Sequence, residues 1–393
     1  MENCFEIPSH YREIQDQAFK FARERLFPLL AKMDDDEWYP EHLMRELGQN
    51  GYLGITADPE YGGAGADLIT AGVIGEAFGY WNMNAVAIWG PHENLCLNNI
   101  LRNGNGTQKA RYLPKMITGE WVGALGLTEP GAGSDALGGM STKAVRDGDS
   151  YILNGSKIFI SNGPVADVIL VYAKTAPERG AKGISAFVVE KDTPGFSVAQ
   201  KFRKMGWRGA PTGELVFDNC RVPVENLVGT ENGGVGIVMS GLNIERAFLS
   251  TGVVGECQRC LDLAVEYASQ RKQFGQTIGS FQMVQAHLAE MYTEIEATRL
   301  LVYKALWACN DLEQGGGGRG DIHRLTAAAL LKAGETNIMV VDKAAQVFGG
   351  SAFIWETEIN RHYRNAKVTT LGGGTSEVRK LIIAQELLRK VGG

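Results

Sequence analysis

YILNGSKIFI at residues 151–160 and DVILVYAK at residues 167–174 decide the fold class of this chain. Both runs are rich in β-branched and aromatic residues, as are GISAFVVEK at 183–191 and GELVFDN at 213–219. Asn-Gly, Gly and Pro turn signals separate the four runs. Short strands joined by such turns predict an antiparallel sheet or barrel in the middle of the chain.

The segments on either side of these strands have helical spacing. In residues 8–31 apolar side chains recur at the period of an α-helix, and similar patterns continue to residue 118. Long helical patterns return after Gly236. We therefore predict an α+β multidomain protein, because 393 residues suffice for two to three domains. The expected parts are an all-α domain at 1–120, an antiparallel β domain at 121–232 and an α-helical bundle at 233–393.

This order of elements disfavours a Rossmann dinucleotide fold. Strands and helices do not alternate as βαβ units, and no G-x-G-x-x-G follows a predicted strand and opens a helix.

Composition excludes several classes of partner. The net charge of −6 gives no basic face for nucleic acid or an anionic membrane, and no run of about 18 apolar residues predicts a membrane span. The start, MENCFEIPSHYREIQ, lacks a secretory core and transit-peptide character. We expect a cytoplasmic protein, with a mature mitochondrial matrix form left open.

Cys257 and Cys260 form the one C-x-x-C and have no second ligand pair, so no metal is predicted.

Two glycine-containing stretches can be turns or ligand loops. In LTEPGAGSD at 127–135, exposed backbone N–H groups and the hydroxyls of Thr128 and Ser134 suit a pyrophosphate or a carbonyl oxygen. In LGGGTSEVRK at 371–380, three glycines precede a predicted helix and permit close approach of another molecule. A plain turn is the alternative interpretation of each stretch.

Five motifs in order resemble the acyl-CoA dehydrogenase family over nearly the whole chain. They are TEPGAGSD, NGSKIFISNG at 154–163, RKQFG at 271–275, QVFGG at 346–350 and GTSEVRKLI at 374–382. NLCLNNILRNGNGTQKARYLPKM at 94–116, VMSGLNIER at 238–246 and FGQTIGSFQ at 274–282 look most like the isovaleryl-CoA dehydrogenase branch. The resemblance implies a four-helix bundle as the C-terminal domain.

The resemblance also implies FAD, bound non-covalently between the β domain and the bundle. Phe159 would lie against the flavin ring, where many relatives carry Trp, and Ser161 would bond to flavin N5. Arg271, Phe274 and Gln282 would reach the FAD of a neighbouring subunit, which implies a homotetramer built as a dimer of dimers. The full set of cofactor contacts implied by the resemblance is Leu125, Leu127, Thr128, Gly133, Ser134, Phe159, Ser161, Arg271, Phe274, Gln282, Gln346, Gly349, Gly350, Thr375 and Glu377.

The catalytic base is expected at Glu245. Many family members place a Glu in the loop before the last helix, but that position is Gly373 here, which cannot accept a proton. Glu245 interrupts an apolar helical stripe, as in the isovaleryl branch, and burial would raise its pKa toward the working range of a base. A buried structural ion pair is the alternative. Arg246 points about 100° away from Glu245 on an ideal helix.

The missing side chains at Gly372 and Gly373 would leave room for a branched acyl chain, and the N–H of Gly373 would donate to the thioester carbonyl. The residues expected around the substrate are Ser134, Leu242, Arg246, Gly372, Gly373, Gly374, Ala87 and Pro91.

The implied reaction is α,β-dehydrogenation of a short or medium, branched acyl-CoA, with electrons passed to an electron-transfer flavoprotein. The alternatives within this fold are an acyl-CoA or nitroalkane oxidase and an acyl-CoA desulfinase. A catalytically silent flavin-binding scaffold is a third possibility. The acyl chain itself is left open.

Overall fold

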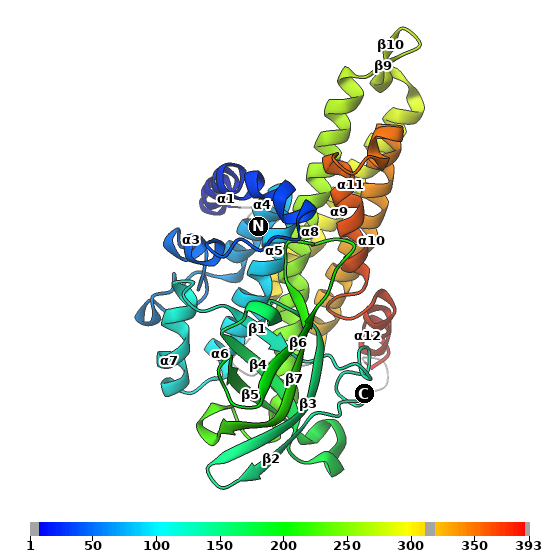
Figure 1. The fold of residues 1–393 in the computed structure, drawn as a ribbon. Helices are drawn as coiled ribbons and strands as arrows, with labels where there is room; N and C mark the ends of the chain where they lie inside the picture. The colour runs from blue at the N-terminus through cyan, green and yellow to red at the C-terminus, as the bar shows by residue number, and fades with distance from the viewer. Residues whose placement is uncertain (1–7, 311–318, 390–393) are drawn as a thin grey trace.

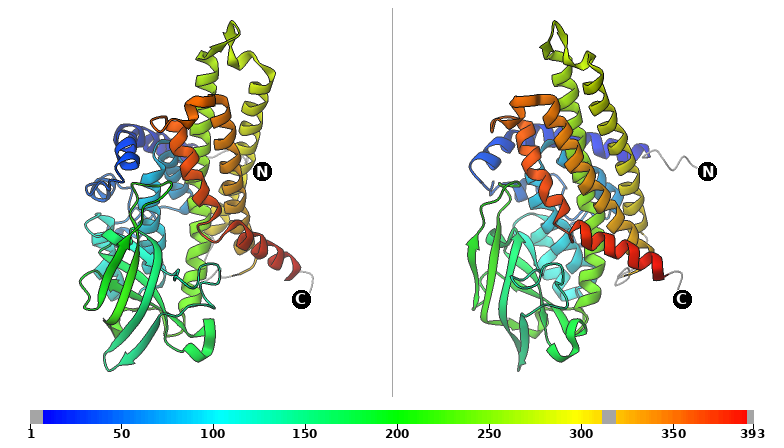
Figure 2. Two further views of the ribbon diagram at one scale, coloured as in Figure 1. Left: turned by 45° about the vertical axis from the view of Figure 1, so that its right-hand side comes forward. Right: turned by 90° about the vertical axis from the view of Figure 1, so that its right-hand side faces the viewer.

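The computed structural model describes residues 8–310 and 319–389. A twisted sheet lies at one end of the molecule, the N-terminal helices pack above it, and long C-terminal helices run alongside both (Figures 1 and 2). The expected fold class, two helical regions around a middle β region, is confirmed. None of the described helices is long and apolar enough to cross a membrane.

The helices differ in length between the two helical regions. The N-terminal region has short helices, whereas three helices of the C-terminal region exceed 25 residues. The α-helices are α1 (Ser9–Phe21), α2 (Leu30–Asp35), α3 (Leu43–Gln49), α4 (Leu68–Trp81), α5 (Met83–Gly90), α6 (Asn98–Asn103), α7 (Gly106–Ile117), α8 (Gly234–Gln270), α9 (Gln282–Asn310), α10 (Asp321–Phe348), α11 (Glu358–Ala366) and α12 (Ser376–Arg389).

The main sheet has the order β6-β7-β3-β2-β4-β5-β8, with β1 beside β4. Most pairs are antiparallel, as expected, but β1–β4 and one residue pair of β2–β4 are parallel. The strands are β1 (Gly123–Gly126), β2 (Lys143–Asp147), β3 (Ser150–Ser161), β4 (Val168–Lys174), β5 (Ile184–Glu190), β6 (Phe196–Lys201), β7 (Thr212–Pro223) and β8 (Leu227–Val228), with a separate hairpin of β9 (Lys272–Gln273) and β10 (Gln276–Thr277).

Strand β4 shows how the sheet joins the helices. Its side chains are buried along its length except at the end, because alternate residues enter two different cores. Val168, Leu170 and Tyr172 pack with α6, α7 and the start of α8, while Ile169 and Val171 pack within the sheet. The sheet is therefore fixed against the N-terminal half of α8, the segment that carries Glu245.

Residues 83–103 do not form one continuous α-helix. Between α5 and α6 the backbone adopts a π-helical segment, η4 (Pro91–Leu97). Proline lacks a backbone N–H, and single π turns inside helices are frequent at functional sites. The segment places Asn94 against α8.

Candidate active site

Glu245 lies in the interior of α8 and is 7% exposed. One carboxylate oxygen, Oε2, accepts a hydrogen bond of 2.6 Å from Asn94 Nδ2. Burial raises the pKa of Glu245 to about 7, and the bond from Asn94 opposes that rise. In residues 8–310 and 319–389 no ion pair involves Glu245. The ion-pair alternative has no support in this geometry.

Arg246 turns away from Glu245, as its helical position predicts. It is buried, and its Nε donates to the carbonyl oxygen of Gly373 at 3.0 Å. Its Nη1 donates to Asn243 Oδ1 at 3.1 Å. Arg246 therefore ties α8 to the glycine loop, which is the name used here for Gly372–Gly374.

The backbone of the glycine loop explains part of its sequence. Gly373 and Gly374 have φ of 67° and 91°, in the left-handed region that favours glycine. A Cβ on Gly373 would lie 2.9 Å from Leu330 Cδ2, whereas one on Gly372 would meet nothing closer than 3.6 Å. The backbone conformation thus favours glycine at 373, while a side chain at 372 would make only an ordinary van der Waals contact with the Val368 carbonyl.

The other residues expected around the substrate lie on neighbouring elements. Ala87 on α5 and Pro91 at the start of η4 are buried. Leu242 is half-buried, one turn before Glu245 on α8. Ser134 is exposed in the loop that follows β1.

A buried ion pair supports that loop. Lys157 Nζ on β3 lies 2.7 Å from Glu129 Oε1, and both side chains are almost completely buried. Lys157 also donates to the carbonyl of Leu127 at 3.1 Å, and Glu129 accepts from the backbone N–H groups of Ser141 and Thr142. Burial opposes ionisation of Glu129, but Lys157 and these donors lower its pKa to about 2. Both ends of the loop are therefore anchored to the sheet.

An irregularity in β3 leaves the Phe159 side chain exposed at the surface. The register with β7 shifts between Lys157 and Ile160, and Phe159 has φ of 60°. A non-glycine residue in this region is strained, and bulges of this kind re-aim a side chain. The Phe159 ring is 65% exposed and lies 5.6 Å from the ring of Phe202. Ser161, two residues further along β3, is half-buried.

The remaining cofactor candidates form a second group at the far end of the bundle. The β9–β10 hairpin projects from the tip of α8 and α9, away from the sheet (Figure 1). Phe274 in its turn is 92% exposed with φ of 51°. Tyr267 of α8 stacks on Phe348 at 4.3 Å between centroids, which joins this end of α8 to the end of α10. The exposed candidates here are Arg271, Phe274, Gln282, Gln346, Gly349 and Gly350.

Within one chain, the cofactor candidates near the β domain do not meet those at the far end of the bundle. The hairpin and the sheet lie at opposite ends of the molecule (Figures 1 and 2). Thr375 and Glu377 lie in a third place, at the N-terminal end of α12, where Thr375 Oγ1 accepts from Val378 N at 3.3 Å.

The residues expected to meet FAD fit a large ligand. Gly131, Gly133 and Gly350 lie outside the left-handed region, and a Cβ on any of them would meet nothing within 4 Å. Packing within the chain therefore does not require glycine there, whereas close approach of a ligand or second chain would. The exposed Phe159 ring and the hydroxyls of Thr128, Ser134 and Ser161 add a stacking surface and donors suited to a flavin.

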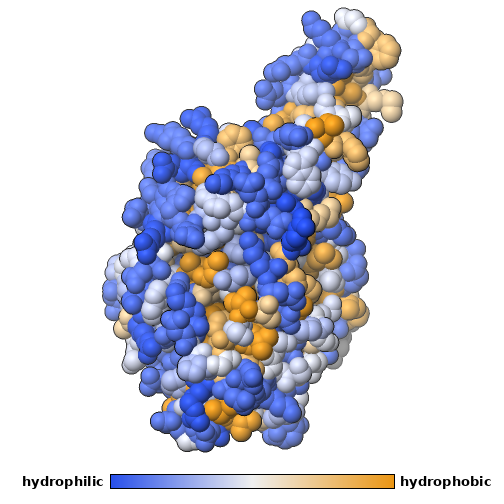
Figure 3. Space-filling view, viewed as in Figure 1, coloured by the Kyte–Doolittle hydropathy of each residue, from blue (hydrophilic) through white to orange (hydrophobic). Residues whose placement is uncertain are grey.

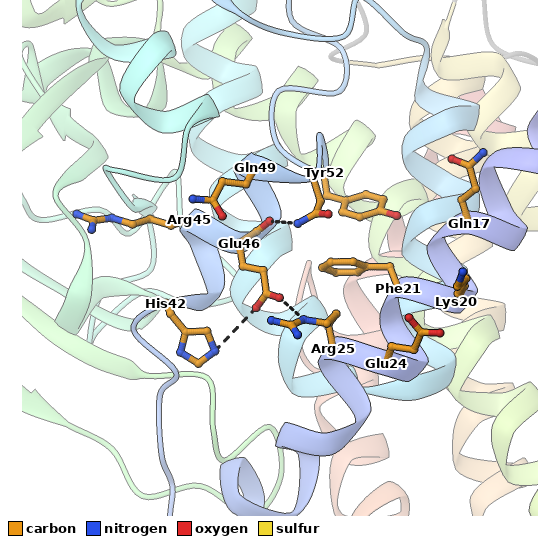
Figure 4. Close-up of a pocket in the computed structure, with 11 residues that line it drawn as sticks. Gln17, Lys20, Phe21, Glu24, Arg25, His42, Arg45, Glu46, Gln49 and Tyr52 are labelled. Atoms are coloured by element: carbon orange, nitrogen blue, oxygen red, sulfur yellow. Dashed lines mark hydrogen bonds and ion pairs between the residues drawn. The ribbon is translucent and has the colours of Figure 1, made fainter.

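A cleft of about 750 Å³ lies elsewhere, between α1 and α3 (Figure 4). It is crossed by an ion pair of Arg25 with Glu46, and His42 lies 3.9 Å from Glu46. No predicted site residue lines it.

The described residues contain no group of three or more His, Cys, Asp or Glu arranged to hold a metal.

Sequence reasoning missed two features of the site: the contact of Asn94 with Glu245 and the Glu129–Lys157 pair. Lys157 could have been found, because Tyr151, Leu153 and Lys157 share the inward face of β3 and a buried lysine needs an acidic partner. No periodicity marks Asn94, because its position depends on the π-helical turn.

Comparison with known proteins shows a family relationship along the chain. Family models of the acyl-CoA dehydrogenase N-terminal, middle and C-terminal domains match residues 8–120, 124–220 and 232–388. The mitochondrial isovaleryl-CoA dehydrogenase of Oryza sativa subsp. japonica is 42% identical over 380 residues, 96% of this chain and 91% of that protein.

Solved structures agree with this assignment. Butyryl-CoA dehydrogenase from Megasphaera elsdenii has a TM-score of 0.93 at 35% identity, covering 98% of this chain and 99% of that one. The FAD complex of PigA has a TM-score of 0.92 at 31% identity, with the same coverage. This chain therefore belongs to the acyl-CoA dehydrogenase family, whose members are FAD-dependent oxidoreductases.

Proposed function

We propose that this protein dehydrogenates a short or medium, branched acyl-CoA of the isovaleryl type to its 2-enoyl-CoA, with Glu245 as the base. The observation that carries the proposal is the buried Glu245 carboxylate, which has Asn94 as its single hydrogen-bond partner in the described residues. A pKa of about 7 suits a proton acceptor at neutral pH.

The residues of this chain have separate roles in the proposed reaction. Asn94 holds Oε2 of Glu245 and leaves Oε1 to take the α-proton of the acyl group. The N–H of Gly373 donates to the thioester oxygen, where negative charge develops as the α-proton leaves. Leu242, Ala87 and Pro91 surround the acyl chain, and the open side of Gly372 receives its branch. Bound FAD supplies the acceptor for the hydride from the β-carbon, so that the α–β double bond forms as the two hydrogens leave.

The separation of the cofactor candidates between two ends of the chain supports assembly with a second subunit, in which the hairpin of one subunit reaches the β domain of another. The proposed assembly is the homotetramer expected from the family resemblance. An electron-transfer flavoprotein is the proposed acceptor, and the cytoplasmic location expected from the sequence stays a prediction.

Anaerobic titration of the FAD-loaded protein with a panel of acyl-CoAs tests this function. Isovaleryl-CoA should bleach the flavin fastest, ahead of butyryl-CoA and octanoyl-CoA, because the branch fills the space beside Gly372. Faster reduction by the straight chains would contradict the branched specificity. In air, turnover that consumes O₂ at the rate of substrate loss would instead favour the oxidase alternative.

A further inference from the structure

Two buried arginines donate hydrogen bonds to backbone carbonyls of the glycine loop. Arg379 on α12 is fully buried, and its Nη2 donates to the carbonyl of Gly372. Its Nη1 donates to the carbonyls of Thr369 at 2.9 Å and Leu330 at 3.2 Å. Arg246 holds the next carbonyl, that of Gly373. Successive peptide units of the loop thus each have a guanidinium on their oxygen.

The opposite side of the same peptide units is unpaired. In the part of the chain that the structure describes, the N–H groups of Leu371 and Gly372 donate to Val368 O, but those of Gly373 and Gly374 donate to nothing. The Gly372 carbonyl and the Gly373 N–H belong to one peptide unit. Donation by Arg379 to that carbonyl therefore polarises the N–H at the other end.

Within residues 8–310 and 319–389, the two arginines that contact the glycine loop, Arg246 and Arg379, have no carboxylate paired with them. Burial lowers the pKa of both to about 10; at Arg379 the charge of Arg246 adds to this effect, and the carboxylates of Glu335 and Glu377 oppose it. Buried cations without a directly paired carboxylate are costly. A negative charge that develops beside the loop would offset that cost.

We propose that Arg379 is a positioning residue for the thioester: through the Gly372 carbonyl it orients and polarises the Gly373 N–H that binds the substrate oxygen. This inference rests on the proposed function, because it requires a thioester at the loop. As the α-proton passes to Glu245, the thioester oxygen gains negative charge, and the polarised N–H stabilises it without rearranging. Arg379 itself touches neither substrate nor cofactor.

The test uses the FAD-loaded protein with the 2-enoyl-CoA product carrying ¹³C at its thioester carbonyl. Isotope-edited infrared difference spectra report how strongly that carbonyl is polarised. In the wild type the C=O stretch should fall below its frequency in water, and in Arg379→Gln it should return toward that frequency. Anaerobic flavin reduction should slow by about ten- to a hundredfold in this variant, less than the roughly 10²–10³ typical of deleting an oxyanion donor itself.

Arg389→Gln is the matched control, because it makes the same change on α12 at an exposed arginine, which pairs with Glu386. It should leave both readouts unchanged. If Arg379→Gln does not fold, Arg379→Lys decides the question. A lysine cannot reach two carbonyls with a planar fork, so the frequency shift should shrink. An unchanged carbonyl frequency in a folded Arg379 variant overturns the inference, even if its rate falls. Wild-type flavin that no acyl-CoA reduces would instead overturn the proposed function.

Discussion

At the scale of the residue, the site depends on how Glu245 is buried. Its position could be predicted from the sequence, because a carboxylate interrupting an apolar helical stripe is visible as a pattern. Its partner could not be predicted. Asn94 is 151 positions away and reaches Glu245 through a π-helical turn that no local pattern reveals.

Loss of Asn94 should move the pH dependence of catalysis. Glu245 must be ionised to take a proton, so flavin reduction should rise with pH through a value near 7. The bond from Asn94 favours the ionised form, and Asn94→Ala should therefore shift this rise to higher pH, with recovery in alkaline buffer. Stopped-flow reduction across pH measures it. Asn98→Ala, which removes a bond to Thr56, is the control. Coincident pH profiles for wild type and Asn94→Ala would exclude this role.

The same burial should cost stability. The pKa of Glu245 is raised on folding from an ordinary 4.5 to about 7, so its ionisation opposes folding as pH rises through that interval. Glu245→Gln removes this penalty and should stabilise the protein above pH 7 by up to about 3 kcal/mol. At pH 4 the two proteins should differ little. Thermal unfolding at both pH values checks the sign, and a variant less stable at high pH would contradict it.

At the scale of the element, the strands and long helices could be predicted, whereas short or irregular segments could not. The runs at 151–160 and 167–174 match β3 and β4 to within one residue at each end, and the pattern from 236 begins inside α8. Strands β1, β2 and β6 were missed, because β6 is largely exposed and the other two are short. Their pairing depends on partners distant in sequence rather than on local composition.

The Glu129–Lys157 pair belongs to this scale, because it fixes a loop to a strand. Lys157→Met should leave a buried carboxylate unpaired, which typically costs about 3–5 kcal/mol, and should weaken FAD binding. Thermal unfolding and equilibrium dialysis of FAD measure the two effects. Lys191→Met breaks the exposed pair with Asp167 and should change neither by much. Equal FAD affinity in Lys157→Met and wild type would show that the pair does not support the cofactor loop.

At the scale of the whole molecule, one chain does not bring all the cofactor candidates together. Hydrophobic residues reach the surface on the projecting end of the bundle (Figure 3), and Phe274, Met283 and Phe353 are each more than 80% exposed. Clustered exposure of large apolar side chains marks an interaction surface. The oligomer is an expectation from the family resemblance alone, since composition and periodicity carry no information about contacts between chains.

Phe274→Ser should therefore separate subunits and release FAD together. Phe274 and Gly275 both have positive φ, as in a type I′ turn, so the hairpin displays the ring outward. Sedimentation velocity and flavin absorbance measure the two losses. Val145→Ser removes an exposed apolar side chain from β2 and serves as the control. A Phe274→Ser protein that sediments as the wild type with full FAD would rule out a role for the hairpin.

The proposed reaction depends most directly on Glu245 as the base. Glu245→Gln preserves shape and the bond from Asn94 but cannot accept a proton. Anaerobic stopped-flow mixing of the FAD-loaded variant with isovaleryl-CoA should show flavin reduction slowed by roughly 10²–10⁴-fold, or more where no water can substitute, with FAD content unchanged. Reduction of the variant's flavin at the wild-type rate would contradict the assignment and leave Glu245 a structural carboxylate.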